Sequence, residues 1–165
     1  MVAEMRWLKR WRGTTGSPEK VQLLEKLGAD HILNYRETPD WGVKVKELTG
    51  GIGVDHVIEV AGLASMRQSL ESIKLFGVIS IVGFLSGMSG DGPTHLENLL
   101  RPCTTRGIGE RTKAELEDVI PAIEGNPDKL RPVLDENVFK FEETNKAYEY
   151  LDSGKHRGKV CIEFP

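Results

Sequence analysis

The sequence predicts an α/β fold in which a parallel sheet is connected by crossover helices. Short runs of apolar, β-branched residues alternate along the chain with stretches whose apolar residues recur at helical spacing. Several of the apolar runs are nearly continuous, as expected for parallel strands that helices cover. The length of 165 residues is that of one domain with a substantial core.

The first predicted helix begins near residue 17 and is followed by a short predicted strand. Ser17 is a suitable N-cap and Pro18 is favoured at the first helical position. Gly28 is expected to end this helix, and residues 31–34 predict a short strand. The apolar face of the helix would be formed by Val21, Leu24 and Leu27.

The next segments repeat the alternation. Thr38 and Pro39 predict a second helix start, and the glycines of residues 50–53 predict a turn into a strand over 54–60. A strongly apolar strand is predicted over 77–82. Between these strands, helical spacing links Leu63, Met66, Leu70 and Ile73.

The remaining elements are shorter. Residues 86–94, rich in Gly and Ser, predict a loop, followed by a short helix near 96–100 and a strand near 104–108. Thr112 and Glu115 have the spacing of a capping box, and Pro121 loosens the helix that follows. Beyond about residue 128 we expect a strand over 138–141, a helix bearing Ala147, Tyr148 and Leu151, and a last strand over 159–164.

Composition excludes several classes of protein. No apolar run approaches the roughly 18 residues of a membrane span, so a soluble chain is expected. Cys103 and Cys161 are far apart, which argues against a disulfide framework, and the four histidines are scattered, so no metal site is expected. No nucleophile elbow, paired carboxylates or Cys-His constellation is apparent, and no catalytic residue is assigned.

Charge is distributed unevenly. The net charge is −3, but residues 1–13 carry +3, which leaves −6 on the rest of the chain. A basic start bearing tryptophan is compatible with a targeting peptide or a nucleic-acid arm. The favoured interpretation is that this basic segment replaces sequence that would otherwise stand there. We therefore expect no nucleic-acid partner. We also expect no membrane partner and a cytoplasmic location.

Six separated segments resemble the medium-chain dehydrogenase/reductase superfamily, specifically the cofactor half of zinc-type alcohol dehydrogenase-like and quinone reductase-like members. They are residues 14–20 (TTGSPEK), 27–35 (LGADHILNY), 50–60 (GGIGVDHVIEV), 77–85 (GVISIVGFL), 106–108 (RGI) and 158–162 (GKVCI). The resemblance implies a Rossmann-like sheet that is incomplete, with the first strand and the glycine-rich loop missing. It implies a basic start outside the family over 1–13, a partial dinucleotide-binding domain over 14–127, and a segment over 128–165 that returns to the catalytic domain.

A G-x-G-x-x-G loop is absent from the sequence. Neither Gly51-Ile52-Gly53 nor Gly107-Ile108-Gly109 has a glycine three positions on. That loop holds the pyrophosphate of a dinucleotide at a helix N-terminus, so any binding by this chain is expected to be weak.

The resemblance implies that Lys20 and Tyr35, together with Gly16 and Ser17, hold the 2′-phosphate of NADP. An ammonium, a phenol and helix N-terminal amides suit a phosphate dianion, whereas an NAD site would carry Asp or Glu at the end of the strand. Taken without the resemblance, Lys20 reads as a solvated lysine, Ser17 as a cap and Tyr35 as an edge aromatic. Further cofactor contacts are implied at Val60, Ala61, Gly62, Gly83, Phe84, Leu85, Gly107 and Ile108.

The function implied by the resemblance is the cofactor-binding part of an NAD(P)H-dependent oxidoreductase, inactive alone, with NADP favoured over NAD. Its reaction would be hydride transfer to or from an alcohol, a carbonyl or an activated alkene. Zinc would be bound by the absent half and not by this chain. The alternative is a non-enzymatic truncated domain that forms a homodimer or pairs with a full-length relative. Another Rossmann-like enzyme, such as a methyltransferase, fits the motifs less well.

Overall fold

A computed structural model describes residues 12–89, 91–110, 112–127, 130 and 132–165. The basic start predicted over 1–13 lies outside these residues except for Arg12 and Gly13. The chain divides into two compact units. One unit holds the described residues of 12–13, 17–32 and 112–165, and the other holds 14–16 and those of 33–110.

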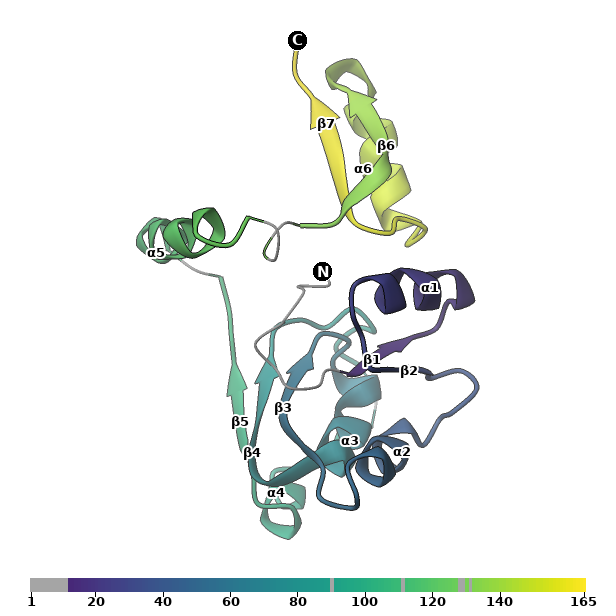
Figure 1. Ribbon diagram of the computed structural model, residues 1–165, viewed down its shortest axis with the longest axis vertical. Coiled ribbons are helices and arrows are strands. Elements are labelled where there is room, and N and C mark those ends of the chain that lie inside the picture. Colours follow the sequence, from purple (N-terminus) through teal and green to yellow (C-terminus); the bar gives the residue numbers. More distant parts are fainter. Residues whose placement is uncertain (1–11, 90, 111, 128–129, 131) are drawn as a thin grey trace. The chain divides into compact units, whose positions relative to one another are not determined.

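The second unit is built on a three-stranded parallel sheet in the order β3-β4-β5, which Figure 1 shows with its strands side by side. Helix α3 packs on β3 and β4, and α2 packs on α3. The elements are α2 (Trp41–Leu48), β3 (Val54–Glu59), α3 (Leu63–Ser72), β4 (Ile73–Ile81), α4 (Glu97–Leu100) and β5 (Thr104–Gly107).

The core of this unit lies between α3 and the sheet. Leu70, Ile73 and Ile79 are almost completely buried and contact one another. Val54, Val57, Met66, Ile81 and Cys103 pack around them. Burial of these side chains holds α3 against β3 and β4.

Glycine allows α2 to approach α3 closely. A Cβ at Gly42 would lie 2.3 Å from the carbonyl oxygen of Gln68, a distance that no side chain could occupy. The Gly42 amide instead donates to Gln68 Oε1 at 2.8 Å. The close packing of the two helices therefore depends on a residue whose importance the helical pattern did not reveal.

In the first unit, β6 and β7 form a parallel pair, with α6 packed against both strands. The helix α5 has the predicted capping box, in which Thr112 Oγ1 accepts from the Glu115 amide and the Glu115 side chain accepts from the Thr112 amide. Its elements are α1 (Pro18–Lys26), α5 (Lys113–Glu124), β6 (Leu134–Lys140), the 3₁₀ turn η1 (Phe141–Glu143), α6 (Thr144–Asp152) and β7 (Lys159–Glu163).

Two further strands, β1 (Arg12–Thr15) and β2 (His31–Asn34), form a separate two-stranded sheet.

Most predicted elements are confirmed, including the α1 start at Ser17-Pro18 and the left-handed Gly28 after it. The prediction of a helix start at Thr38-Pro39 is wrong, since α2 begins at Trp41 with Asp40 as its N-cap. The reason is a turn in which the Asn34 carbonyl accepts from the Glu37 and Thr38 amides.

The start of β4 also differs from the prediction. Ile73 was expected at the end of a helix, but it opens β4 directly after α3. Its register with β3 is irregular, passing from Val54–Ile73 to His56–Val78, and Phe76 within the irregular stretch has φ 61°. Burial of Ile73 in the core outweighs its helical spacing. The predicted α/β fold is confirmed, and no described helix has the length and apolar character needed to cross a membrane.

Candidate functional site

The turns that follow β3 and β4 lie side by side at the carboxyl edge of the sheet. The parallel register pairs Glu59 with Ile81, so both strands end at the same level. We call residues 60–62 and 83–86 the paired turns. The Val60 carbonyl accepts from the Leu85 amide at 3.2 Å, and the Ala61 carbonyl accepts from the Ser86 amide at 2.8 Å and from its hydroxyl at 2.6 Å.

Two glycines of the paired turns have no room for a side chain. Gly62 has φ 95°, and a Cβ there would lie 2.9 Å from the Cα of Phe84. A Cβ at Gly83 would lie 2.9 Å from the Val60 carbonyl oxygen. Glycine is therefore required at Gly62 for both its backbone conformation and the close approach of the second turn.

The end of β5 lies at the same edge of the sheet. Gly107 pairs with Ile81 in the register between β4 and β5, and the Ile108 amide donates to the Ile81 carbonyl at 2.8 Å. The structure thus brings together eight of the predicted site residues on one edge of one sheet: Val60, Ala61, Gly62, Gly83, Phe84, Leu85, Gly107 and Ile108.

A buried carboxylate that the sequence analysis did not select lies beneath the first turn. Glu59 is only 3 % exposed at the end of β3. Its oxygens accept from the amides of Ala61 and Gly62 and from the hydroxyls of Ser65 and Ser69. A useful signal was present in the sequence, since an acidic residue ends an apolar strand immediately before a glycine turn.

The four predicted phosphate-binding residues are divided between the units. In the second unit, the ring of Tyr35 lies against Gly16, where a Cβ would be 2.5 Å from the Tyr35 hydroxyl oxygen and 3.0 Å from Arg36 Nε. The Tyr35 amide donates to the Thr15 carbonyl at 3.1 Å. Arg36, which the sequence analysis did not select, therefore adds a cation beside Tyr35 and Gly16.

Ser17 and Lys20 belong to the first unit. The Ser17 hydroxyl donates to the Glu19 carboxylate, and this hydrogen bond is the main reason why the pKa of that carboxyl lies below its usual value. Lys20 Nζ lies 3.5 Å from the Gly154 carbonyl oxygen. A negative charge thus lies next to Ser17, which the sequence analysis did not take into account.

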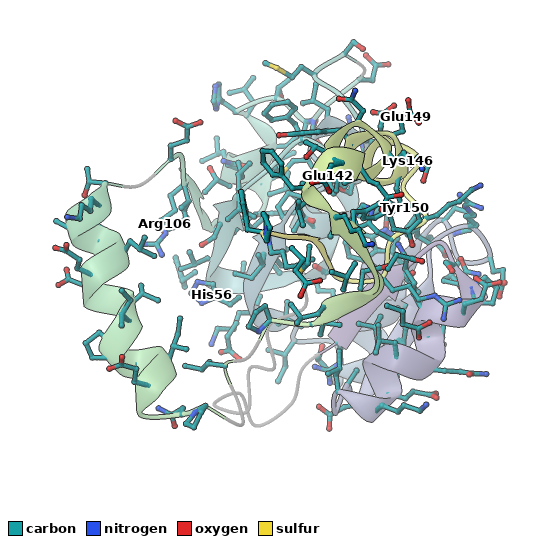
Figure 2. All side chains as sticks on the ribbon, turned by 90° about the horizontal axis from the view of Figure 1, so that it is seen from above. His56, Arg106, Glu142, Lys146, Glu149 and Tyr150 are labelled. Carbon is teal, nitrogen blue, oxygen red and sulfur yellow. The ribbon has the colours of Figure 1, made fainter. Side chains whose placement is uncertain are left out.

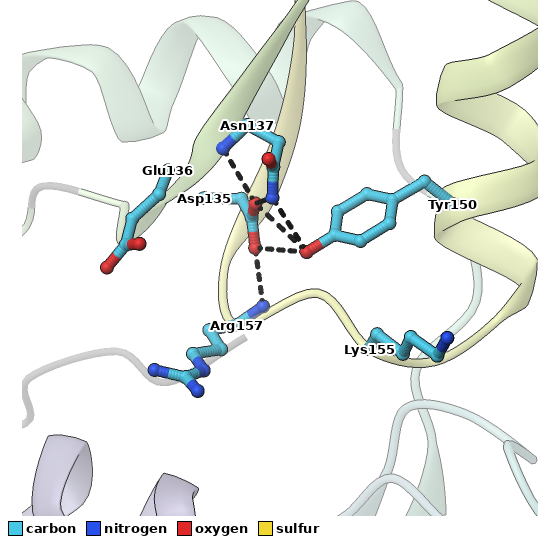
Figure 3. A pocket seen from close by; sticks show the side chains of 6 residues that line it. All are labelled: Asp135, Glu136, Asn137, Tyr150, Lys155 and Arg157. Atoms are coloured by element: carbon cyan, nitrogen blue, oxygen red, sulfur yellow. Dashed lines mark hydrogen bonds between the residues drawn. The ribbon is translucent and has the colours of Figure 1, made fainter.

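A second cluster of polar side chains lines a pocket between β6, α6 and the segment before β7 (Figure 3). At its centre Asp135, 6 % exposed, accepts from the amides of Arg157 at 2.7 Å and Asn137 at 2.9 Å. Burial by itself would raise the pKa of Asp135, but these bonds and those from the Asn137 and Tyr150 side chains lower it to about 2. The pocket is lined by Asp135, Glu136, Asn137, Tyr150, Lys155 and Arg157.

The donors to Asp135 come from β6, α6 and the segment before β7, so this carboxylate holds the tail of the chain together.

The remaining chemically active side chains form no catalytic group among the described residues. His56 on β3 and Arg106 on β5 are exposed on the sheet, and Arg106 Nε lies 3.4 Å from Ser80 Oγ (Figure 2). Glu142, Lys146 and Glu149 are exposed on η1 and α6. Burial raises the pKa of the Cys103 thiol. Within the part of the chain that the structure describes, no three His, Cys, Asp or Glu side chains are grouped to hold a metal ion.

Sequence comparison assigns the family. A model described as zinc-binding dehydrogenase matches residues 10–125, and the chain belongs to this family. A zinc-type alcohol dehydrogenase-like protein of Schizosaccharomyces pombe is 35% identical over 153 residues, which cover 91% of this chain and 43% of the relative. Prostaglandin reductase-3 of Mus musculus is 27% identical over 175 residues, covering 93% and 45%.

Solved structures agree. A protein described as an alcohol dehydrogenase from Sinorhizobium meliloti 1021 superposes with a TM-score of 0.81 at 39% identity, over 94% of this chain and 44% of that one. An NAD-dependent alcohol dehydrogenase superposes with a TM-score of 0.79 at 28% identity, covering 93% and 43%. These matches confirm the resemblance to medium-chain dehydrogenases and the Rossmann-like fold class. The chain spans less than half the length of each of these four proteins.

Proposed function

We propose that this chain is the cofactor-binding part of an NAD(P)H-dependent oxidoreductase of the alcohol dehydrogenase or quinone reductase type. The observation that carries the proposal is the pair of hydrogen-bonded turns at the carboxyl edge of the parallel sheet. Open α/β sheets bind ligands outside the carboxyl ends of their strands. The glycines at 62 and 83 lie where a Cβ would meet the opposite turn, so the two turns can stay close together.

In this proposal the turns receive the ribose and nicotinamide half of the dinucleotide. Bound there, the nicotinamide would supply or accept the hydride in the reaction of the whole enzyme. Phe84 and Leu85, 63% and 85% exposed, offer apolar surface beside the turns. Their role is to orient the ring and to keep water from one of its faces.

The finer proposal is a preference for NADP over NAD, supported by the phenol of Tyr35 and the guanidinium of Arg36 next to Gly16. A phosphate dianion pairs well with a guanidinium, because charge-assisted hydrogen bonds are the stronger ones. Lys20 and Ser17 are phosphate ligands in this proposal on the resemblance alone. Glu19 opposes it, since its carboxylate accepts from the Ser17 hydroxyl, so this bond must break when a phosphate binds.

The test is a titration of the chain with NADPH and with NADH, followed by nicotinamide fluorescence. We expect weak binding that favours NADPH. Arg36→Ala and Tyr35→Phe should weaken NADPH binding about tenfold while NADH binding changes little, since each removes a contact to the phosphate alone. Glu19→Gln is the matched control, because it removes a negative charge next to Ser17 and should therefore strengthen NADPH binding. Equal affinities for both cofactors in all variants would overturn the NADP preference, and no binding of either would overturn the cofactor role.

We further propose that the chain does not turn over alone and does not bind zinc itself. In support, its described residues hold no group of three His, Cys, Asp or Glu side chains suited to a metal ion. The check is the rate of NADPH oxidation with alcohols, carbonyls and activated alkenes, and the zinc content of the purified chain after dialysis. Turnover or stoichiometric zinc in the chain alone would refute these points. A cytoplasmic location belongs to the same proposal and is testable by cell fractionation.

The alternative is a non-enzymatic domain that forms a homodimer or pairs with a full-length relative. One face of α5 favours it, because large apolar side chains there are exposed, from 38% at Ile123 to 60% at Leu116. Exposed apolar patches commonly mark interaction surfaces. Light scattering of the chain, alone and mixed with a full-length dehydrogenase, separates the alternatives: a monomer that binds NADPH counts against pairing, whereas a stable complex without cofactor binding supports it.

A further inference from the structure

We propose that Glu59 is a positioning residue that sets the geometry of both paired turns, although it contacts only the first. The inference rests on the proposed cofactor role of these turns for its functional meaning. The structural part of the inference does not depend on that role. It concerns the orientation of two peptide groups, each hydrogen-bonded to Glu59 through its N–H and to the second turn through its carbonyl.

The carboxylate of Glu59 accepts from four donors. Oε1 receives the Ala61 amide at 2.9 Å, the Gly62 amide at 3.0 Å and the Ser65 hydroxyl at 2.6 Å. Oε2 receives the Ser69 hydroxyl, which is itself fully buried. With 3 % exposure, Glu59 has little access to water, so these donors replace its hydration. The negative charge also lies at the N-terminus of α3, where the helix dipole favours it.

The peptide group between Val60 and Ala61 is held at both ends. Its N–H donates to Glu59 and its carbonyl accepts from the Leu85 amide at 3.2 Å. The next peptide, between Ala61 and Gly62, repeats the arrangement: its N–H donates to Glu59 and its carbonyl accepts from the Ser86 amide and hydroxyl.

A trans peptide is planar, with its N–H and C=O directed to opposite sides. Rotation of either peptide away from Glu59 would therefore also turn its carbonyl away from the second turn. Leu85 and Ser86 should lose their acceptors, although the donors to Glu59 are Ala61, Gly62, Ser65 and Ser69. This coupling is what makes Glu59 a positioning residue for the whole edge, beyond its local role at the start of α3.

The experiment measures amide hydrogen exchange, residue by residue, in the chain and its variants. In Glu59→Ala we expect exchange to accelerate about tenfold or more at Leu85 and Ser86 as well as at Ala61 and Gly62, as loss of a charge-assisted acceptor implies. Glu59→Gln keeps one oxygen for the two amides and should largely rescue Leu85 and Ser86. The matched control is Ser69→Ala, which removes a donor to Oε2 alone and should leave Leu85 and Ser86 unchanged.

Acceleration confined to Ala61 and Gly62, or equal effects in Ser69→Ala and Glu59→Ala, would overturn the proposal. If circular dichroism shows that Glu59→Ala does not fold, Glu59→Asp decides the question. This variant keeps the charge but withdraws it by one methylene group, so Leu85 and Ser86 should still lose protection, and unchanged exchange there overturns the proposal.

NADPH titration of the same variants links the geometry to the cofactor. A misplaced binding turn weakens affinity, so Glu59→Ala or Glu59→Asp should bind NADPH about tenfold or more weakly, with Glu59→Gln close to the unsubstituted chain. If the unsubstituted chain binds no NADPH, the proposed function fails, but the exchange pattern still decides whether Glu59 holds the turns.

Discussion

Replacement of Asp135 by asparagine should destabilise the tail formed by β6, α6 and β7 in a manner that depends on pH. The carboxylate joins three parts of this tail, since it accepts from the amide of Asn137 within β6, from the hydroxyl of Tyr150 on α6 and from the amide of Arg157 before β7. Asparagine keeps one oxygen but presents an NH₂ group where the second oxygen accepted. One donor then faces another donor in a buried site.

The magnitude follows from the pKa of Asp135, which lies at about 2 in the folded chain against 3.8 for the free group. Since one pKa unit corresponds to about 1.36 kcal/mol, the ionised form stabilises the fold by about 2 kcal/mol. Because the folded pKa is the lower one, this contribution is complete above about pH 4 and is lost as the pH falls towards 2. We therefore expect Asp135→Asn to cost about 2 kcal/mol at pH 7 and much less near pH 2.

The assay is native-state hydrogen exchange of the β7 amides, corrected for intrinsic rates, at pH 7, 4 and 2.5. Glu136→Gln is the matched control, because this neighbouring carboxylate is exposed and makes the same change of charge. The reasoning would be refuted if Asp135→Asn protected the β7 amides at pH 7 as well as the unsubstituted chain does. It would also be refuted if the loss of protection were as large at pH 2.5 as at pH 7.

Two further predictions concern backbone conformation and are checked by urea unfolding followed by far-ultraviolet circular dichroism. Phe76 is 81% exposed at φ 61°, so Phe76→Gly should stabilise the chain by about 1 kcal/mol, whereas Leu75→Gly, at an exposed neighbour without positive φ, should destabilise it. Gly62→Ala should cost about 2 kcal/mol or more, because φ is 95° and the new Cβ would lie 2.9 Å from the Cα of Phe84. Gly28→Ala has φ 90° but open space, and should cost only about 1 kcal/mol; equal costs at both glycines would contradict the steric argument.

Local signals in the sequence were sufficient for much of the fold. The N-terminus of α1 follows from Pro18, whose fixed φ suits the first helical position. That of α5 follows from Thr112 and Glu115, which bond to backbone amides within one turn of themselves. Likewise, the ends of β3 and β4 could be located from their apolar runs and glycines. The roles of the residues at those ends depended on the family resemblance and remain predictions.

Interactions between residues far apart in the sequence could not be found in this way. The start of β4 was missed because Ile73 satisfies helical spacing, and only its burial beside Leu70 and Ile79 assigns it to the strand. Arg36 was missed because nothing in its local sequence indicates that its side chain approaches Gly16, twenty positions earlier.

The sequence by itself therefore determined the class of fold, the family and the edge of the sheet at which a site was expected. The tertiary structure decided which polar groups hold that edge and the tail together. Glu59 acquires its role through Ser69, ten residues away, and Asp135 through the amide of Arg157, 22 residues away. Such pairs form only after hydrophobic burial has brought the elements together, because an isolated carboxylate in an unfolded chain is satisfied equally well by water.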